Sequence, residues 1–251
     1  MRNQLLPALL VFLFPTALVA ADDPAPPDGN TPAVSKKLDT QWHILVNPAR
    51  RVRGRKDLPK DGPLVNIHNL ELTGPGQGHP FVLGQYADDG KWGYVDGSVV
   101  RVEGRNASLK LGHAENFELE GILELGNEGG WFMLVGWDQG RGYSIINIGF
   151  RESPSPWFIT EYRGGAAITD AHQQVAKFAW HKDQPMRLTV KDRELNLQVG
   201  KVEVLQRQTL ANYAAGDIIL GVYDTKYGPR PVQINSLRIR NLESKTAVEK
   251  P

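Results

Sequence analysis

From about residue 64 onward the chain consists of short apolar runs interrupted by Gly, Asp and Asn. Residues 117–125, FELEGILEL, carry apolar side chains at alternate positions with glutamates between them. Successive side chains of a strand point to opposite faces, so this run predicts a half-buried strand. The same alternation predicts further strands at residues 186–190, 195–199, 202–204, 218–222 and 232–239.

Many short strands joined by tight turns favour an antiparallel two-sheet sandwich over a parallel sheet, which would need crossover helices. One short helix is expected at residues 170–179, where Ala171, Val175 and Phe178 share a helical face. The predicted class is therefore all-β, with one folded domain at residues 38–243.

The first residues have the pattern of an export signal. Arg2 provides a positive start, residues 5–18 are mostly apolar, and Val19-Ala20-Ala21 offers small residues before Asp22. We expect a signal peptide at residues 1–21, although a permanent membrane anchor is the alternative. Residues 22–37, rich in Pro and Ala, are expected to form a disordered linker, and residues 244–251 a flexible tail.

Composition narrows the function classes. Lys plus Arg total 29 and Asp plus Glu total 28, so no strong field of one sign favours nucleic acid as a partner. The chain has no cysteine, which excludes disulfides, thiolate metal sites, a Cys nucleophile and a lipoprotein anchor. An exported fold without disulfides is typical of a bacterial periplasmic or secreted protein.

Several segments together resemble a known family. Residues 90–100 read GKWGYVDGSVV and are followed by Phe117-Glu118-Leu119. Towards the end come Trp180, RLTV at 187–190, GDIILG at 216–221 and LRIRNL at 237–242. This series is similar to the 3-keto-disaccharide hydrolase domains of exported planctomycete proteins. The resemblance implies a jelly-roll sandwich of the concanavalin A-like lectin and glucanase superfamily, whose concave face often holds a glycan.

The sequence departs from that family where its chemistry would lie. The Asn-Ser-Gly and Glu-x-Gln stretches common in the family are replaced by GGWFMLVGW at 129–137 and ITEYR at 159–163. The Glu-x-Asp-x-x-Glu strand of the related family-16 glycoside hydrolases is absent. Glu118, Glu120 and Glu124 share one strand face, but they lie opposite an apolar stripe, so a hydrogen-bonded sheet surface is expected there.

Three central segments carry apolar or aromatic side chains on both faces. A strand such as residues 131–137, WFMLVGW, is either buried on both sides or exposes aromatic surface for binding. If alternate positions line up, one face presents Trp137, Tyr143, Asn147, Trp157, Glu161 and Arg163. An aromatic ring together with carboxylate, amide and guanidinium groups is a typical saccharide site. The alternative is that the tryptophans are core residues and that Glu161 and Arg163 form a surface ion pair.

No cofactor is predicted. The six histidines show no spacing that would bring a pair onto one metal ion. Residues 88–90, DDG, and 224–228, DTKYG, have turn composition, and calcium held by loop oxygens is the alternative interpretation.

The leading hypothesis is a periplasmic or secreted glycan-recognition domain that binds saccharide on the concave sheet face. The enzyme alternative is a hydrolase or lyase acting on a 3-keto-glycoside or disaccharide, with Glu161 as acid or base. A third alternative is a structural module of the cell envelope without a small ligand. Carbohydrate is the expected partner, with no nucleic acid, no stable membrane insertion after signal cleavage and no particular oligomer.

Overall fold

The structure is a computed structural model that describes residues 38–46, 71–72, 91–95, 98–103, 107–124, 129–147, 155–178, 184–223 and 232–244. All of them belong to one compact unit, Ser35–Pro251. The expected signal peptide at 1–21 and linker at 22–37 lie outside the described residues, as does the expected tail after Ser244.

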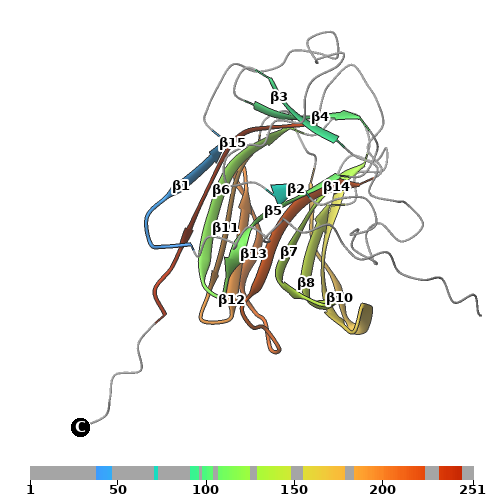
Figure 1. Ribbon diagram of the computed structural model, residues 1–251. Helices are drawn as coiled ribbons and strands as arrows, with labels where there is room; N and C mark the ends of the chain where they lie inside the picture. The colour runs from blue at the N-terminus through green and yellow to red at the C-terminus, as the bar shows by residue number, and fades with distance from the viewer. Residues whose placement is uncertain are drawn as a thin grey trace, which may run out of the picture. The chain divides into compact units, whose positions relative to one another are not determined.

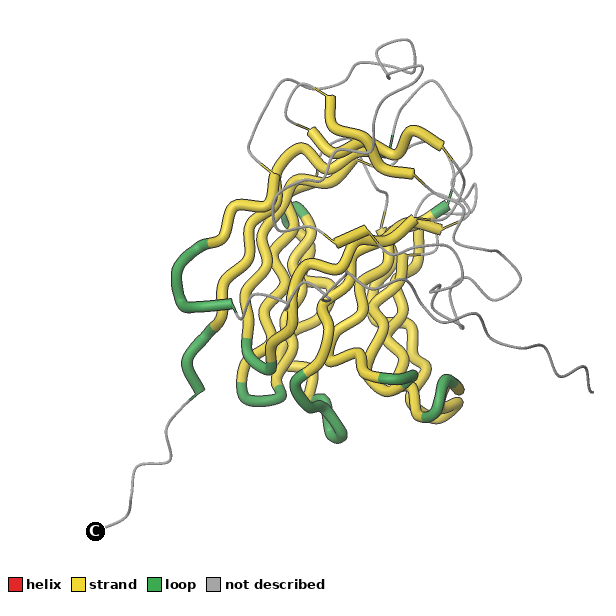
Figure 2. The backbone as a smooth tube through the Cα atoms, in the orientation of Figure 1, coloured by secondary structure: helices red, strands yellow, loops and turns green. Residues whose placement is uncertain are grey.

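The described residues form strands joined by turns and short connections, and no helix occurs among them (Figure 2). Sheet A comprises β1 (His43–Val46), β3 (Lys91–Val95), β4 (Ser98–Glu103), β6 (Phe117–Glu124), β11 (Gln184–Lys191), β12 (Glu194–Val199), β13 (Val202–Thr209) and β15 (Gln233–Asn241). Sheet B comprises β2 (Glu71–Leu72), β5 (Ala107–Ala114), β7 (Gly130–Asp138), β8 (Arg141–Asn147), β9 (Ser155–Arg163), β10 (Ala166–Phe178) and β14 (Gly216–Tyr223).

The two sheets are the two layers visible in Figure 1. Sheet A runs in the order β13-β12-β11-β6-β15-β4-β3, with β1 also paired to β15, and sheet B runs β10-β9-β8-β7-β14-β5-β2. The strand pairings in both sheets are antiparallel. The predicted all-β, two-sheet antiparallel jelly roll is confirmed.

One apolar core lies between the sheets. Phe117 and Leu119 of β6 in sheet A share it with Trp131 and Met133 of β7 in sheet B, and all four are almost completely buried. Trp92 of β3 stacks on Trp131 across the layers, with ring centroids 6.5 Å apart. Fully burying such a side chain stabilises the folded state by roughly 1.5–3 kcal/mol. The apolar side chains at alternate positions of these strands therefore hold the two sheets together.

Strand β7 is buried on both faces. Its even-numbered side chains Phe132 and Leu134 belong to a second, smaller cluster with Trp137, Tyr162 and Ile219. Of the two interpretations of the apolar run at 131–137, burial on both sides is therefore the one that the structure supports.

The expected helix at 170–179 is wrong, because residues 166–178 form strand β10, paired with β9. The pairing changes register between Ala167 and His172 and again between Gln174 and Ala176. Val175, Ala176 and Phe178 pack against the core. These irregularities break the two-residue repeat and produce apolar spacings that resemble those of a helix.

Tight turns end the hairpins of sheet B. Gln139 and Gly140 between β7 and β8, and Gly164 and Gly165 between β9 and β10, all have positive φ. Two successive positive φ values are typical of a type I′ turn, which matches the twist of the strands that it joins. The Gly165 amide donates to the Gly140 carbonyl at 2.9 Å, so the two turns lie against each other.

Gly136 interrupts the alternation of β7. Its φ is +60°, and a Cβ there would lie 2.6 Å from Tyr213 and 2.7 Å from the Ala214 carbonyl. The pairing with β8 shifts between Val135 and Asp138. As a result, Trp137 joins the face of Phe132 and Leu134, so the expectation that it shares the face of Tyr143 and Glu161 is wrong.

Replacing Gly136 with Ala is expected to destabilise the fold more than replacing Gly164 with Ala. Both residues have φ near +60°, and an L side chain there costs about 1–2 kcal/mol. The Cβ at Gly136 would overlap the 213–214 segment and cost roughly 1–3 kcal/mol more, whereas nothing lies within 4 Å at Gly164. Urea unfolding of both variants measures the difference, and equal losses would contradict the close approach.

Candidate functional site

A buried carboxylate at the end of β9 organises a polar cluster. Glu161 Oε1 accepts hydrogen bonds from Arg163 Nε at 2.8 Å and from Asn212 Nδ2 at 2.9 Å. Glu161 Oε2 accepts from the Tyr143 hydroxyl at 3.1 Å. These four residues, Tyr143, Glu161, Arg163 and Asn212, are called the Glu161 cluster below.

The sheet register brings the cluster together. Tyr143 of β8 lies directly opposite Glu161 of β9, and Arg163 follows two residues later on the same face. Asn212 comes from the turn between β13 and β14, and its backbone amide donates to the Tyr143 hydroxyl at 3.2 Å. The Tyr213 ring lies 6.5 Å from the Tyr143 ring, and its hydroxyl donates to the Glu115 carbonyl. The turn is thereby fixed over this end of the sandwich.

The cluster borders a cavity of about 350 Å³. Its lining residues are Arg141, Gly142, Tyr143, Glu161, Tyr162, Arg163, Gly164 and Asn212. The Glu161 side chain is 10% exposed and that of Arg163 is 57% exposed. The cavity therefore combines a carboxylate held in a defined orientation with a guanidinium that reaches solvent.

The other residues predicted for the site lie elsewhere. Trp157 is fully buried and stacks on Phe178, with centroids 5.8 Å apart. Asn147 is fully buried and donates to the Pro156 carbonyl at 3.3 Å. Trp137 is on the opposite face of sheet B, edge-to-face with Tyr162 at 5.6 Å. The structure thus unites Tyr143, Glu161 and Arg163 and separates Trp137, Asn147 and Trp157 from them.

The burial of both tryptophans agrees with the second interpretation, and Glu161 and Arg163 do form an ion pair, but the Glu161 side chain is 10% exposed, so the pair is not the surface pair that this interpretation expected. The predicted common face of β9 exists, but it is the face directed into the sandwich. Glu161 lies four residues beyond Trp157, or about 13 Å along an extended strand, so only the later residues reach the end of the core.

Sequence reasoning missed Asn212, Arg141 and Tyr162. Asn212 follows a predicted strand and has a turn-forming side chain, so a turn could have been predicted there. Its pairing with Glu161 spans 51 positions of the chain and leaves no local signal.

Burial governs the protonation of the tyrosines around the cavity. It raises the pKa of the Tyr143 hydroxyl, a shift that the Asn212 amide partly offsets and the negative charge of Glu161 increases. Burial also raises the pKa of Tyr162 to about 12, against the opposing effect of hydrogen bonds with Ser144 and Thr160. The Tyr143 hydroxyl is therefore un-ionised at neutral pH and donates its hydrogen bond to Glu161.

The described lining of the cavity offers one carboxylate and several hydrogen-bond donors. Glu161 is the sole carboxylate among the described residues that line it. Glycoside hydrolysis generally needs two carboxyl groups roughly 5–10 Å apart across the bond.

The described residues contain no group of three His, Asp or Glu side chains arranged to hold a metal ion. Both loops considered for calcium, at 88–90 and 224–228, lie outside the described residues. Within the described part of the chain, no helix is long and apolar enough to cross a membrane.

No family model matches the sequence, and neither does any curated protein. Solved structures do match. The carbohydrate recognition domain of Emp46p, in its metal-free form, aligns with a TM-score of 0.53 and 12% identity over 80% of this chain and 98% of that domain. The exoplasmic/lumenal domain of VIP36, in its Ca²⁺/Man-bound form, aligns with a TM-score of 0.51 and 10% identity over 82% and 92%.

An enzyme shares the architecture as well. Crh5 transglycosylase without ligand aligns with a TM-score of 0.50 and 10% identity over 83% of this chain and 88% of that chain. Together these similarities define the class: the chain has a lectin-like jelly-roll fold of the concanavalin A-like kind. This architecture carries both binding domains and enzymes, so the site must distinguish between them.

Tyr143→Phe is expected to destabilise the protein by about 1–3 kcal/mol, because Glu161 Oε2 and the Asn212 amide both lose a partner. The variant is also expected to alter the alkaline response. The pKa of Tyr143 is raised above 10.0 in the folded protein, so its neutral hydroxyl contributes its full stabilisation below pH 10. As the pH rises above that value, the tyrosine of the unfolded chain ionises first, and the free energy of unfolding falls.

Urea unfolding at neutral and alkaline pH measures both effects of Tyr143→Phe. The variant should lose less stability than the wild type as the pH rises through the range in which an unfolded tyrosine ionises. Identical pH profiles for the two proteins would show that the hydroxyl is not held as the structure indicates.

Proposed function

We propose that the chain is an exported glycan-recognition domain and that it binds saccharide in the cavity beside Glu161. The observation that carries the proposal is the Glu161 carboxylate, fixed by three donors and lying next to the exposed guanidinium of Arg163. A cavity of about 350 Å³ is in the range of small-ligand sites.

The cluster suits sugar hydroxyls, which both donate and accept hydrogen bonds. A carboxylate oxygen has lone pairs for more than one donor, so Glu161 can accept from a ligand as well as from the protein. Arg163 uses its Nε on Glu161, and a guanidinium has five N–H donors in total. Charge-assisted hydrogen bonds of this kind are stronger than neutral ones.

No tryptophan is among the described residues that line the cavity, so a sugar ring would not stack on an indole there. Trp137 and Trp157 are both buried, so they support the architecture rather than stack on a sugar. Tyr143, Glu161 and Arg163 remain from the predicted set, and the binding surface moves from the concave face to the end of the sandwich.

The similar structures support this proposal through the fold. One of them is named a carbohydrate recognition domain and another was solved with Ca²⁺ and Man. The signal-like pattern at residues 1–21 and the absence of cysteine support export to the periplasm or the exterior.

Hydrolysis of a 3-keto-glycoside is the competing proposal. The resemblance of residues 92–242 to 3-keto-disaccharide hydrolase domains and the partly enclosed position of Glu161 favour it. The single carboxylate among the described residues that line the cavity favours binding.

A glycan panel tests the proposal with wild type, Glu161→Gln, Arg163→Ala and the control Arg207→Ala. Removing a charged hydrogen-bond partner costs about 1.5–3 kcal/mol, so the two site variants should weaken binding by roughly 10- to 150-fold. Arg207 lies on β13, is 75% exposed and pairs with Glu194, so its removal should leave binding unchanged.

The same proteins incubated with 3-keto-glucosides separate the two functions. Product formed by wild type and lost in Glu161→Gln would establish hydrolysis and replace the binding proposal. Glycan binding that is equally strong in all four proteins would exclude this cavity as the site.

A further inference from the structure

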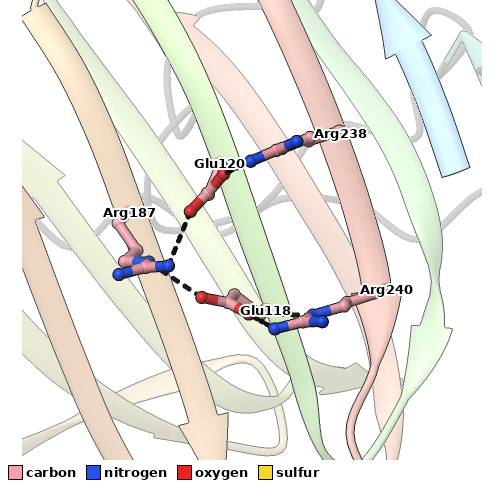
Figure 3. A network of polar contacts seen from close by, with 5 residues as sticks. All are labelled: Glu118, Glu120, Arg187, Arg238 and Arg240. Atoms are coloured by element: carbon pink, nitrogen blue, oxygen red, sulfur yellow. Dashed lines mark hydrogen bonds and ion pairs between the residues drawn. The ribbon is translucent and has the colours of Figure 1, made fainter. Parts of the chain in front are cut away.

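Five charged side chains form a connected network on the outer face of sheet A, on the side away from the core. Figure 3 shows Glu118 and Glu120 of β6 between Arg187 of β11 and the arginines Arg238 and Arg240 of β15. Arg187 bridges the two glutamates, with Nε 2.8 Å from Glu118 and Nη2 2.9 Å from Glu120. Arg238 Nε is 2.8 Å from Glu120, and Arg240 Nε is 2.9 Å from Glu118.

Strand register creates this network. Arg187 and Arg238 lie directly opposite Glu120 on its two sides, and Arg240 lies opposite Glu118. The sequence predicted a hydrogen-bonded sheet surface at these glutamates, and the structure agrees. It adds the arginines, whose positions in the chain are more than 60 residues away from β6.

The network has an excess of positive charge. Three guanidinium groups face two carboxylates, which leaves a net charge of +1. All four carboxylate oxygens already lie within ion-pair or hydrogen-bond distance of an arginine nitrogen. Each guanidinium has five donors and uses its Nε and Nη2 here, so donor capacity remains on the solvent side.

Arg187 is the third arginine of the network and the one that contacts both glutamates. The Arg187 side chain is 56% exposed, whereas its partners Glu118 and Glu120 are 8% and 21% exposed. Without Arg187, each glutamate would still have its own arginine on β15. Arg187 is engaged with both glutamates, and the exposed part of its guanidinium has further N–H donors for an anionic group.

An amphipathic groove runs beside the network. A cavity of about 640 Å³ is lined by residues of β1, β15, β6, β11 and β12, including Arg187 and Arg238. Five adjacent strands span about 19 Å across a sheet, so the lining of the groove extends across the strands. Its lining includes the apolar residues Ile122 and Pro185 and the side chain of Ile44, which is 57% exposed.

Trp42 extends the same surface. Its ring centroid lies 4.2 Å from the guanidinium carbon of Arg238 and 4.5 Å from that of Arg240. Stacking of this kind orients the two guanidinium groups.

We propose that this groove is a second binding site and that it takes an acidic polysaccharide, a chain of uronate residues. Carboxylates of the polymer would pair with Arg187 and Arg238, and the C–H faces of its rings would lie on Ile44, Ile122 and Pro185. A linear polymer fits a groove that crosses several strands. Nucleic acid fits less well, because the network carries a net charge of only +1 and the chain is nearly neutral overall.

Binding of polygalacturonate at low ionic strength tests the proposal, by calorimetry on wild type, Arg187→Ala, Arg187→Lys, Ile44→Ser and the control Arg207→Ala. Arg187→Ala should weaken binding about tenfold. The affinity of Arg187→Lys should lie between those of the wild type and Arg187→Ala, because lysine keeps the positive charge but lacks the planar, bidentate geometry of a guanidinium. Ile44→Ser should weaken binding several-fold, and Arg207→Ala should bind as tightly as the wild type.

Dextran and poly-glutamate serve as the comparison polymers. Dextran should not bind in the groove because it has no charge, and poly-glutamate should bind more weakly than polygalacturonate because it has no sugar rings. Equal affinity for poly-glutamate, equal losses in Arg187→Ala and Arg207→Ala, or no binding of polygalacturonate by the wild type would each overturn the proposal.

Urea unfolding checks that each variant is folded. If Arg187→Ala does not fold, the binding of Arg187→Lys and Ile44→Ser tests the proposal. The groove and the Glu161 cavity share no lining residue. Arg187→Ala should therefore bind the neutral glycans of the panel as wild type does while it loses polygalacturonate, so failure of one proposal is distinguishable from failure of the other.

Discussion

The apolar layer between the two sheets is the constraint on which the other features depend. Phe117 and Leu119 of β6 and Trp131 and Met133 of β7 fill it. Because successive side chains of a strand alternate, filling this layer directs Glu118 and Glu120 to the outer face of sheet A and Phe132 and Leu134 to the outer face of sheet B. The same packing therefore builds the core and places the charged network.

The Glu161 cluster forms where this layer ends. Along β9 the inward-facing residues change from the buried Trp157 and Ile159 to Glu161 and the exposed Arg163. The glycine-containing turns and the segment with Asn212 and Tyr213 lie around this end, and Gly136 leaves space for Tyr213. A carboxylate can be largely buried there because donors from three separate elements satisfy it.

The Glu161 cluster and the charged network on sheet A have opposite arrangements of charge. In the Glu161 cluster a single carboxylate is surrounded by donors, and one guanidinium faces solvent. On sheet A the guanidinium groups outnumber the carboxylates, and an indole and apolar side chains lie beside them. Under the two proposals, neutral sugar hydroxyls bind at the first arrangement and a repeated anionic group binds at the second, on the other sheet of the jelly roll.

Local periodicity determined the all-β class and most of the strands, and it placed Trp157, Glu161 and Arg163 on one face, because residues two apart in a strand project the same way. The tertiary structure alone decided that this face points inward. It also decided that Gly136 moves Trp137 to the other side, that residues 170–178 extend along β9 instead of forming a helix, and that Asn212 reaches Glu161. These outcomes depend on contacts between segments far apart in the chain, which the spacing of residues within one segment does not encode.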